Sequence, residues 1–248
     1  MGVTFGFVTD GSNDLLLAQG IQSVKNAQLS NYEIIVIGNT SIDDGDIKKI
    51  YFDESIKPGW ITKKKNLLAS ESTKEILVIM HDYISLGSTW NEVDYNLLAA
   101  ADWDVAVCRF ENLDGSRWCD WHLWPFNTRF LKLPFKYSIK CLLPYDCTNL
   151  TNLMYVNGTV VIARREYFLN NPLDENRVWG QGEDVEWSIR LRDNWNLRFF
   201  PNLSVKSLKQ KQRAFYTIDR ISLLFVKIFS YMLMVIPKPL SNLFRIKH

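Results

Sequence analysis

Apolar runs with the length of strands alternate with segments of helical spacing in the first half of the chain. The largely apolar runs cover residues 3–9, 33–38, 75–80 and 103–109. The segments with helical spacing cover residues 15–26, 61–70 and 93–101. Strands that are apolar on both faces and separated by helices are typical of a mostly parallel sheet covered on both sides. The pattern therefore predicts an α/β fold.

The second half of the chain is less regular. Residues 111–154 hold many aromatic side chains but few helix or strand patterns, which is typical of a binding loop. Residues 156–163 and 198–205 have the composition of two further strands. We therefore expect one domain over residues 1–205, followed by a basic and apolar tail over residues 206–248.

The tail contains a nearly continuous apolar run, residues 221–236, broken by Lys227 and Ser230. Its 16 residues are fewer than the roughly 20 that span a bilayer as a helix. Two interpretations follow: a helix that completes the core or a dimer contact, or a helix lying in the membrane surface. The second is favoured slightly because cations that attract anionic lipid flank the run: Lys211, Arg213, Arg220, Lys238, Arg245 and Lys247.

Composition excludes several classes of protein. The 29 basic and 27 acidic residues nearly balance, which argues against a nucleic-acid partner bound by bulk electrostatics. The four cysteines form no Cys-x-x-Cys pair, which argues against a zinc ribbon. The first residues lack the charged and apolar regions of a secretory signal. We therefore expect a cytoplasmic protein with reduced thiols, peripheral on the inner face of the membrane if the tail binds lipid.

Small and polar residues follow three of the predicted strands. They are Thr9-Asp10-Gly11, Gly38-Asn39-Thr40 and His81-Asp82-Tyr83. Ligands of parallel α/β sheets bind beyond the carboxyl ends of the strands. These residues therefore predict a nucleotide pocket at that edge.

Two further features could serve such a pocket. Asp82 directly follows a buried strand, where a carboxylate can hold a divalent cation against a diphosphate, with His81 as a second candidate ligand. The alternative is that Asp82 caps the next turn. Lys63, Lys64 and Lys65 begin a predicted helix and could bind phosphate, or they form a solvated lysine cluster.

The stretch Trp179-Gly-Gln-Gly-Glu-Asp184 places two carboxylates behind a Gly-x-Gly turn. The glycines allow a tight turn, and Glu183 and Asp184 then begin a helix whose dipole lowers their pKa. An ionised carboxylate at this place can accept a proton from a sugar hydroxyl. The alternative is an ordinary acidic first turn, with Trp187 in the core.

Taken in order, these features resemble the GT-A glycosyltransferases, in particular the family-2-like group and the galactosyltransferase-type motif Trp-Gly-x-Gly-Gly-Glu-Asp. The resemblance covers roughly residues 3–205. The residues that carry it are Thr9-Asp10-Gly11, Lys65-Asn66, His81-Asp82 and Trp179 to Asp184.

The resemblance implies a Rossmann-like GT-A fold with a nucleotide-sugar half (1–110) and an acceptor half (111–205). It implies a nucleotide-sugar donor bound by Thr9, Asp10, Gly11, Asn39, Lys65, Asn66 and His81. Mn²⁺ or Mg²⁺ at Asp82 would stabilise the diphosphate leaving group. Asp184 would be the catalytic base of an inverting transfer, while Glu183, Trp179 and Gly182 would bind the acceptor. That acceptor would be a saccharide or a lipid-linked glycan, in surface-polysaccharide synthesis.

The chain departs from the family pattern at the metal motif. Met80 stands where the first Asp of Asp-x-Asp is expected, and Asp43-Asp44 stand later than the acidic pair after the second strand. His122 is the candidate for a later metal-binding histidine besides His81. The missing carboxylate supports an alternative function, a non-catalytic nucleotide- or glycan-binding module. A nucleotidyltransferase is disfavoured because no Gly-x-Gly-x-Arg loop follows the first strand.

Overall fold

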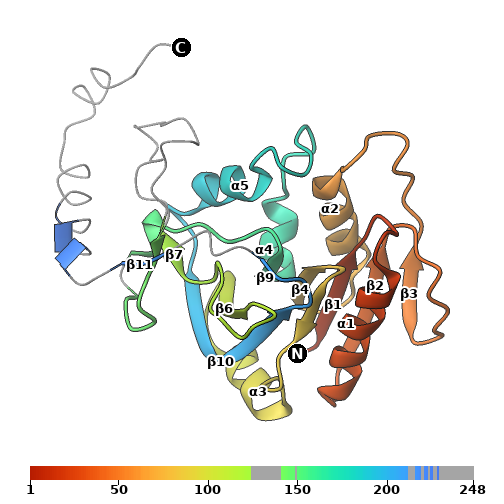
Figure 1. The fold of residues 1–248 in the computed structure, drawn as a ribbon, viewed down its shortest axis with the longest axis horizontal. Coiled ribbons are helices and arrows are strands. Elements are labelled where there is room, and N and C mark those ends of the chain that lie inside the picture. The colour runs from red at the N-terminus through yellow and green to blue at the C-terminus, as the bar shows by residue number, and fades with distance from the viewer. Residues whose placement is uncertain are drawn as a thin grey trace.

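A single eight-stranded sheet forms the centre of the protein (Figure 1). The computed structural model describes residues 1–123, 141–148, 150–211, 216–218, 221–222, 224–225 and 228. The strands lie in the order β3-β2-β1-β4-β9-β6-β10-β5. Their bounds are β1 Val3–Val8, β2 Tyr32–Ile37, β3 Ile47–Ile50, β4 Ile76–His81, β5 Ile84–Leu86, β6 Val105–Glu111, β9 Val160–Arg164 and β10 Leu197–Ser207.

Strands β3, β2, β1 and β4 are parallel, and so are β6 and β10. Strand β9 runs antiparallel between β4 and β6, and β5 runs antiparallel to β10. The predicted mostly parallel α/β sheet is therefore confirmed. The short strands β3 and β5 were not predicted, because four and three residues are too few to give a pattern.

Helices cover both faces of the sheet. Alternate side chains of β4 enter opposite core clusters: Val78 and Met80 pack in the cluster that contains Leu17 of α1, while Leu77 and Ile79 pack on the other side. The first cluster lies under α1 and α3, and the second under α2, α4 and α5. The helix bounds are α1 Asp14–Asn26, α2 Ile61–Glu71, α3 Glu92–Ala100, α4 Arg165–Asn170 and α5 Glu183–Leu191.

The aromatic segment after β6 forms part of a second, small sheet. Its strands are β7 His122–Leu123, β8 Cys141–Leu142 and β11 Tyr216–Thr217. Asp120 anchors the segment: its buried carboxylate accepts hydrogen bonds from the backbone N–H groups of Phe110 and Trp121, from Arg117 and from the Tyr145 hydroxyl. Trp124, Phe126 and Phe130 lie outside the described residues.

The tail is described at a few positions. Those at 221–222, 224–225 and 228 are helical, and Ile221, Leu224, Phe225 and Ile228 are exposed by 49 to 71%. The flanking residues Arg213, Arg220, Lys238, Arg245 and Lys247 lie outside the described residues. Within the described part of the chain, no helix is long and apolar enough to cross a membrane.

Close packing of α2 on β1 depends on Gly6. A Cβ atom at this position would lie 2.2 Å from Leu68 Cδ1, and Leu68 is fully buried. We predict that Gly6→Ala lowers the free energy of unfolding by about 1–3 kcal/mol, because the helix must move outward. The measurement is urea unfolding. Adding Leu68→Ala makes the double loss smaller than the sum of the single losses.

Gly45→Ala is the matched control, because no atom lies within 4 Å of the added Cβ. Its effect stays within about 0.5 kcal/mol. Equal losses for Gly6→Ala and Gly45→Ala would contradict the role of close packing at Gly6.

Candidate active site

The first part of the site forms where β1 and β4 end. Val8 lies opposite His81 in the parallel register, so the residues that follow are neighbours. The Thr9 hydroxyl donates to Asp82 Oδ2 at 2.8 Å, and the Asn13 amide approaches the same oxygen at 3.4 Å. A cavity of about 650 Å³ opens above this contact. Its polar lining includes Thr9, Asp10, Ser12, Asn13, Glu54, Lys64, His81, Asp82, Tyr83, Lys209 and Lys211.

Four of the residues expected to bind the donor do not line this cavity. Gly11 has a φ of 88°, and a Cβ there would lie 2.6 Å from the carbonyl oxygen of Asn39, so these two residues shape the turn. The Asn66 amide donates to the Leu173 carbonyl at 2.9 Å and thereby holds the loop before α5. Lys65 points to the other side of the site.

Lys64 and Lys65 are neighbours on α2 but serve different parts of the site. Lys64 Nζ donates to the Thr9 carbonyl at 2.8 Å and forms an ion pair with Glu54. Lys65 Nζ donates to the Gly158 carbonyl at 2.5 Å. Successive helix residues point about 100° apart, since a turn contains 3.6 residues. Lys64 and Lys65 are therefore not part of a solvated cluster, because both are buried, whereas Lys63 is half-exposed and pairs with Glu175 at the surface.

Gly158 connects the buried lysine to the Glu-Asp motif. Its N–H donates to Asp184 Oδ2 at 2.8 Å, while its carbonyl accepts from Lys65. A Cβ at this position would lie 3.0 Å from Asp184 Cβ and 3.3 Å from Lys65 Nζ. Burial lowers the pKa of Lys65, and the charges of Glu183 and Asp184 oppose that shift. The contact therefore places a cation directly behind two carboxylates.

The Gly-x-Gly turn before α5 uses left-handed backbone. Gly180 and Gly182 have φ of 81° and 67°, and Gly182 is the residue at which α5 is capped. The Trp179 N–H donates to the Gly59 carbonyl at 2.8 Å, which ties the turn to the loop before α2. The Trp179 side chain is nevertheless 67% exposed. A large ring held in solvent beside a cavity is available to stack on a ligand.

A second cavity of about 250 Å³ lies over the start of α5. His81 and Trp179 line both cavities, so the two adjoin. The lining residues are His81, Tyr155, Asn157, Gly158, Thr159, Trp179, Gly180, Gly182, Glu183, Asp184 and Val185. The structure thus brings Asp184 together with the three residues expected to bind an acceptor.

The pKa of Glu183 differs from the expectation. The helix start was expected to lower it, but burial and the neighbouring Asp184 raise it, with Lys65 opposing the rise. Glu183 is buried, with 7% of its surface exposed, so the loss of hydration prevails over the helix dipole. Asp184 is half-buried, and both its oxygens accept backbone hydrogen bonds, from Gly158 and Val185.

The two histidines considered as metal ligands have different surroundings. His81 is buried, and its Nε2 has no hydrogen-bond partner among the described residues. Burial, then the nearby lysines, lower its pKa well below the usual value, so the ring is neutral. His122 lines neither cavity: its Nδ1 lies 2.7 Å from the Asp120 carbonyl, and its ring packs on Tyr155.

The residues around Asp82 do not fit a resident Mn²⁺ or Mg²⁺. Such ions require several oxygen ligands, and Asp82 Oδ2 already accepts the Thr9 hydrogen bond. The part of the chain that the structure describes holds no group of three His, Cys, Asp or Glu side chains suited to a metal. Lys64, Lys209 and Lys211 line the same cavity, and their charges oppose a bound cation.

Sequence reasoning did not single out Gly158, nor Lys209 and Lys211 as members of the site. Gly158 lies in an ordinary strand pattern. The two lysines belong to a basic segment that is 127 or more residues from Asp82 in the chain and reaches it only through the pairing of β10 with β5. No local pattern records such pairing.

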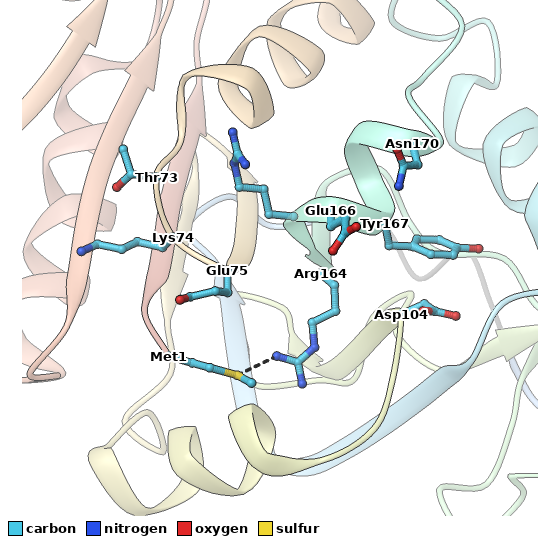
Figure 2. Close-up of a pocket in the computed structure, with 10 residues that line it drawn as sticks. Met1, Thr73, Lys74, Glu75, Asp104, Arg164, Glu166, Tyr167 and Asn170 are labelled. Atoms are coloured by element: carbon cyan, nitrogen blue, oxygen red, sulfur yellow. Dashed lines mark hydrogen bonds between the residues drawn. The ribbon is translucent and has the colours of Figure 1, made fainter.

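A third cavity, of about 570 Å³, lies at the opposite edge of the sheet (Figure 2). Met1 and Glu75 precede β1 and β4 there, so this is the amino end of the parallel strands. The Arg164 guanidinium donates to the carbonyls of Ala99 and Ala101. Those contacts use its donors to hold the fold, so we place the candidate site at the carboxyl edge.

Comparison with solved structures identifies the fold. The chain resembles GalNAc-T7, crystallised with UDP, GalNAc and Mn²⁺, with a TM-score of 0.60 and 15% identity over 86% of this chain and 44% of that one. It also resembles TarS of S. aureus, in a structure of residues 1–349, with a TM-score of 0.51 and 13% identity over 96% of this chain and 66% of that one. This chain therefore spans less than two thirds of each.

No protein-family model matches the sequence, and no curated protein matches it significantly. At 13 to 15% identity, the structural likenesses establish the fold. The predicted GT-A, Rossmann-like α/β fold is confirmed.

We predict that Lys65→Met lowers the free energy of unfolding by about 3 kcal/mol at pH 8, because the buried Glu183 and the half-buried Asp184 lose a nearby cation. Without Lys65 the pKa of Glu183 rises further, so folding favours its protonated form. The variant's stability therefore falls as pH rises through the pKa of Glu183. The loss relative to the unmodified protein is smaller at pH 5 than at pH 8, as measured by urea unfolding.

Lys63→Met is the matched control. Lys63 is half-exposed and forms a surface ion pair with Glu175 at 3.0 Å, which contributes at most about 1 kcal/mol. A loss for Lys65→Met that does not change with pH would contradict the coupling to Glu183.

Proposed function

We propose that this chain is a glycosyltransferase that transfers a sugar from a nucleotide-diphosphate sugar to a saccharide acceptor. One observation carries the proposal: two adjoining cavities share His81 and Trp179, and they differ in the charged residues that line them. The larger is lined by Lys64, Lys209 and Lys211 and by the carboxylates of Asp10, Glu54 and Asp82. The smaller holds Asp184 and Glu183 beside an exposed tryptophan.

The donor would lie with its diphosphate in the larger cavity and its sugar toward His81 and Trp179. The acceptor would occupy the smaller cavity, with its ring on Trp179 and a hydroxyl on Glu183. Neutral His81 carries an unpaired buried nitrogen at the junction, where a sugar hydroxyl can satisfy it.

Asp184 would act as the general base. Its carboxylate takes the proton of the acceptor hydroxyl while that oxygen attacks the anomeric carbon. The bond from the anomeric carbon to the diphosphate oxygen breaks, and the nucleoside diphosphate leaves with the electron pair. Attack from the face opposite the leaving group inverts the anomeric centre. The Gly158 N–H and Lys65 fix the base in place before the acceptor binds.

None of the steps above relies on the expected Mn²⁺ or Mg²⁺, since the residues around Asp82 do not provide a suitable set of metal ligands. GalNAc-T7 was crystallised with Mn²⁺, and that ion belongs to that protein. Calorimetry with nucleoside diphosphates, in EDTA and then in Mn²⁺ or Mg²⁺, measures whether this chain requires a metal.

We predict that Asp184→Asn lowers turnover of the nucleotide sugar about 100- to 10,000-fold, while donor affinity is retained. Asparagine can still accept the Gly158 hydrogen bond through its one oxygen, while its amide group loses the Val185 contact and the base is removed. Turnover is measured by release of nucleoside diphosphate, and affinity by calorimetry. Glu186→Gln is the control, because Glu186 on the same helix pairs with Arg190 at 2.8 Å. Unchanged turnover in Asp184→Asn would refute its role as base.

The same assay distinguishes the enzyme from the alternative, a non-catalytic nucleotide- or glycan-binding module. A module binds nucleoside diphosphates but releases none from nucleotide sugars with any saccharide acceptor. The fixed and half-buried Asp184 beside an exposed Trp179 favours the enzyme, because binding alone does not require a positioned base.

We also propose that the tail contacts the membrane surface, where lipid-linked acceptors of surface-polysaccharide synthesis are found. The support is the exposure of Ile221, Leu224, Phe225 and Ile228, whose spacing places them on one helix face. Exposed apolar side chains on one face argue against the interpretation that this part of the tail completes the core.

For this proposal we predict that the protein sediments with phosphatidylglycerol vesicles more than with phosphatidylcholine vesicles. Leu224→Ser with Phe225→Ser weakens vesicle binding at least about tenfold, since two apolar side chains no longer enter the lipid. Leu15→Ser, an exposed leucine on α1, leaves binding unchanged. Equal vesicle binding by all three proteins would exclude the tail as the membrane contact.

A further inference from the structure

The basic segment after β10 returns to the larger cavity. Strand β10 pairs antiparallel with β5, and Ser207 lies opposite Ile84. The next residue, Leu208, donates its N–H to the Tyr83 carbonyl at 2.8 Å. The chain therefore passes beside Tyr83, the residue that follows Asp82. Lys209 and Lys211 then line the cavity.

Two buried polar residues fix this segment. The Ser207 hydroxyl donates to the Lys209 carbonyl at 2.6 Å. Asn112 makes a reciprocal pair with the backbone of Lys211: its amide donates to the carbonyl at 2.6 Å, and its Oδ1 accepts the N–H at 2.8 Å. Ser207 and Asn112 are fully buried. The backbone of both lysines is thus held in place by hydrogen bonds from two side chains that are shielded from solvent.

Both ammonium groups gather at one aromatic ring. Lys211 Nζ lies 4.0 Å and Lys209 Nζ 5.0 Å from the centre of the Tyr83 ring. Among the described residues, neither forms an ion pair with a carboxylate. Burial, and then the charge of Lys209, lower the pKa of Lys211, while the charge of Asp82 opposes that shift. Two like charges held close together repel each other, and a bound anion relieves that repulsion.

We propose that Lys209 and Lys211 bind the diphosphate of the donor and stabilise it as the leaving group, in place of a divalent cation. The inference rests on the proposed function and identifies the residues that neutralise the phosphates. A nucleoside diphosphate gains negative charge as the sugar departs, and fixed ammonium groups stabilise that charge without reorganisation. Lys64 is committed to Glu54 and the Thr9 carbonyl, so the two later lysines supply the uncommitted charge.

The experiment is calorimetry with the common nucleoside diphosphates, in EDTA and then in Mn²⁺ or Mg²⁺. The proteins are the full chain, the double variant Lys209→Gln and Lys211→Gln, and the charge-preserving double variant Lys209→Arg and Lys211→Arg. Lys206→Gln is the matched control, because Lys206 belongs to the same basic segment but does not line the cavity. Circular dichroism and thermal unfolding confirm that each variant folds.

We expect the full chain to bind a nucleoside diphosphate in EDTA. The glutamine double variant should bind it about 10- to 100-fold more weakly, as expected for the loss of charged hydrogen bonds. The arginine double variant and Lys206→Gln should bind within about threefold of the full chain, a difference below 1 kcal/mol. Raising the salt concentration should lower the nucleotide affinity of the full chain more than that of the glutamine double variant, because salt screens the attraction between the lysines and the phosphates.

Three other outcomes separate this inference from the proposed function. In the first, nucleotide binding requires Mn²⁺ or Mg²⁺ and is equal in the full chain and the glutamine double variant. This result would overturn the role of the lysines but would leave the proposed nucleotide-binding function intact. If the full chain binds no nucleoside diphosphate in either medium, the proposed function itself fails. A glutamine double variant with full affinity in EDTA would also overturn the inference.

Discussion

The site depends on a buried ammonium group. Lys65 Nζ donates to the Gly158 carbonyl and interacts electrostatically with the carboxylates of Glu183 and Asp184, with 1% of the lysine exposed. A charge removed from water is tolerated only where such partners surround it. The contact therefore fixes three elements relative to one another: α2, the entry to β9 and the start of α5. A shift of any of them would leave a buried charge without its partners.

This constraint also divides the site by charge. The antiparallel strand β9 begins at the edge where β4 ends, so Gly158 lies near the end of β4 and lines the smaller cavity. Lys64 lines the larger cavity, whereas Lys65 binds the carbonyl of Gly158, which lines the smaller one, because neighbouring helix residues point in different directions. One helix thus supplies a cation to the larger cavity and a buried cation next to a residue of the smaller one. The acidic pair is kept on one side and the Lys209–Lys211 segment on the other.

The sequence was informative where a pattern is local. Apolar runs located β1, β2, β4 and β6, and the Gly-x-Gly turn located the start of α5. It could not separate Lys64 from Lys65, because both fit one helix pattern and burial depends on what packs against each face. It could not place Lys209 either, since that residue reaches Asp82 only through strand pairing across the fold. The raised pKa of Glu183 could not be predicted from the sequence, because the largest cause of the shift is the burial of its side chain.

The unusual Met80-His81-Asp82 sequence has a physical cause. Met80 is fully buried in the core cluster under α1 and α3, together with Val78 on the same face of β4. A carboxylate at this position would enter the core rather than the cavity, at a cost of several kcal/mol, roughly that of an unpaired buried charge. In this chain Met80 therefore belongs to the core, and the first Asp of Asp-x-Asp has no counterpart at the cavity. Under the proposed function, the positive charge against a diphosphate comes from other elements, among them the segment after β10, whose Lys209 and Lys211 line the cavity with Asp82.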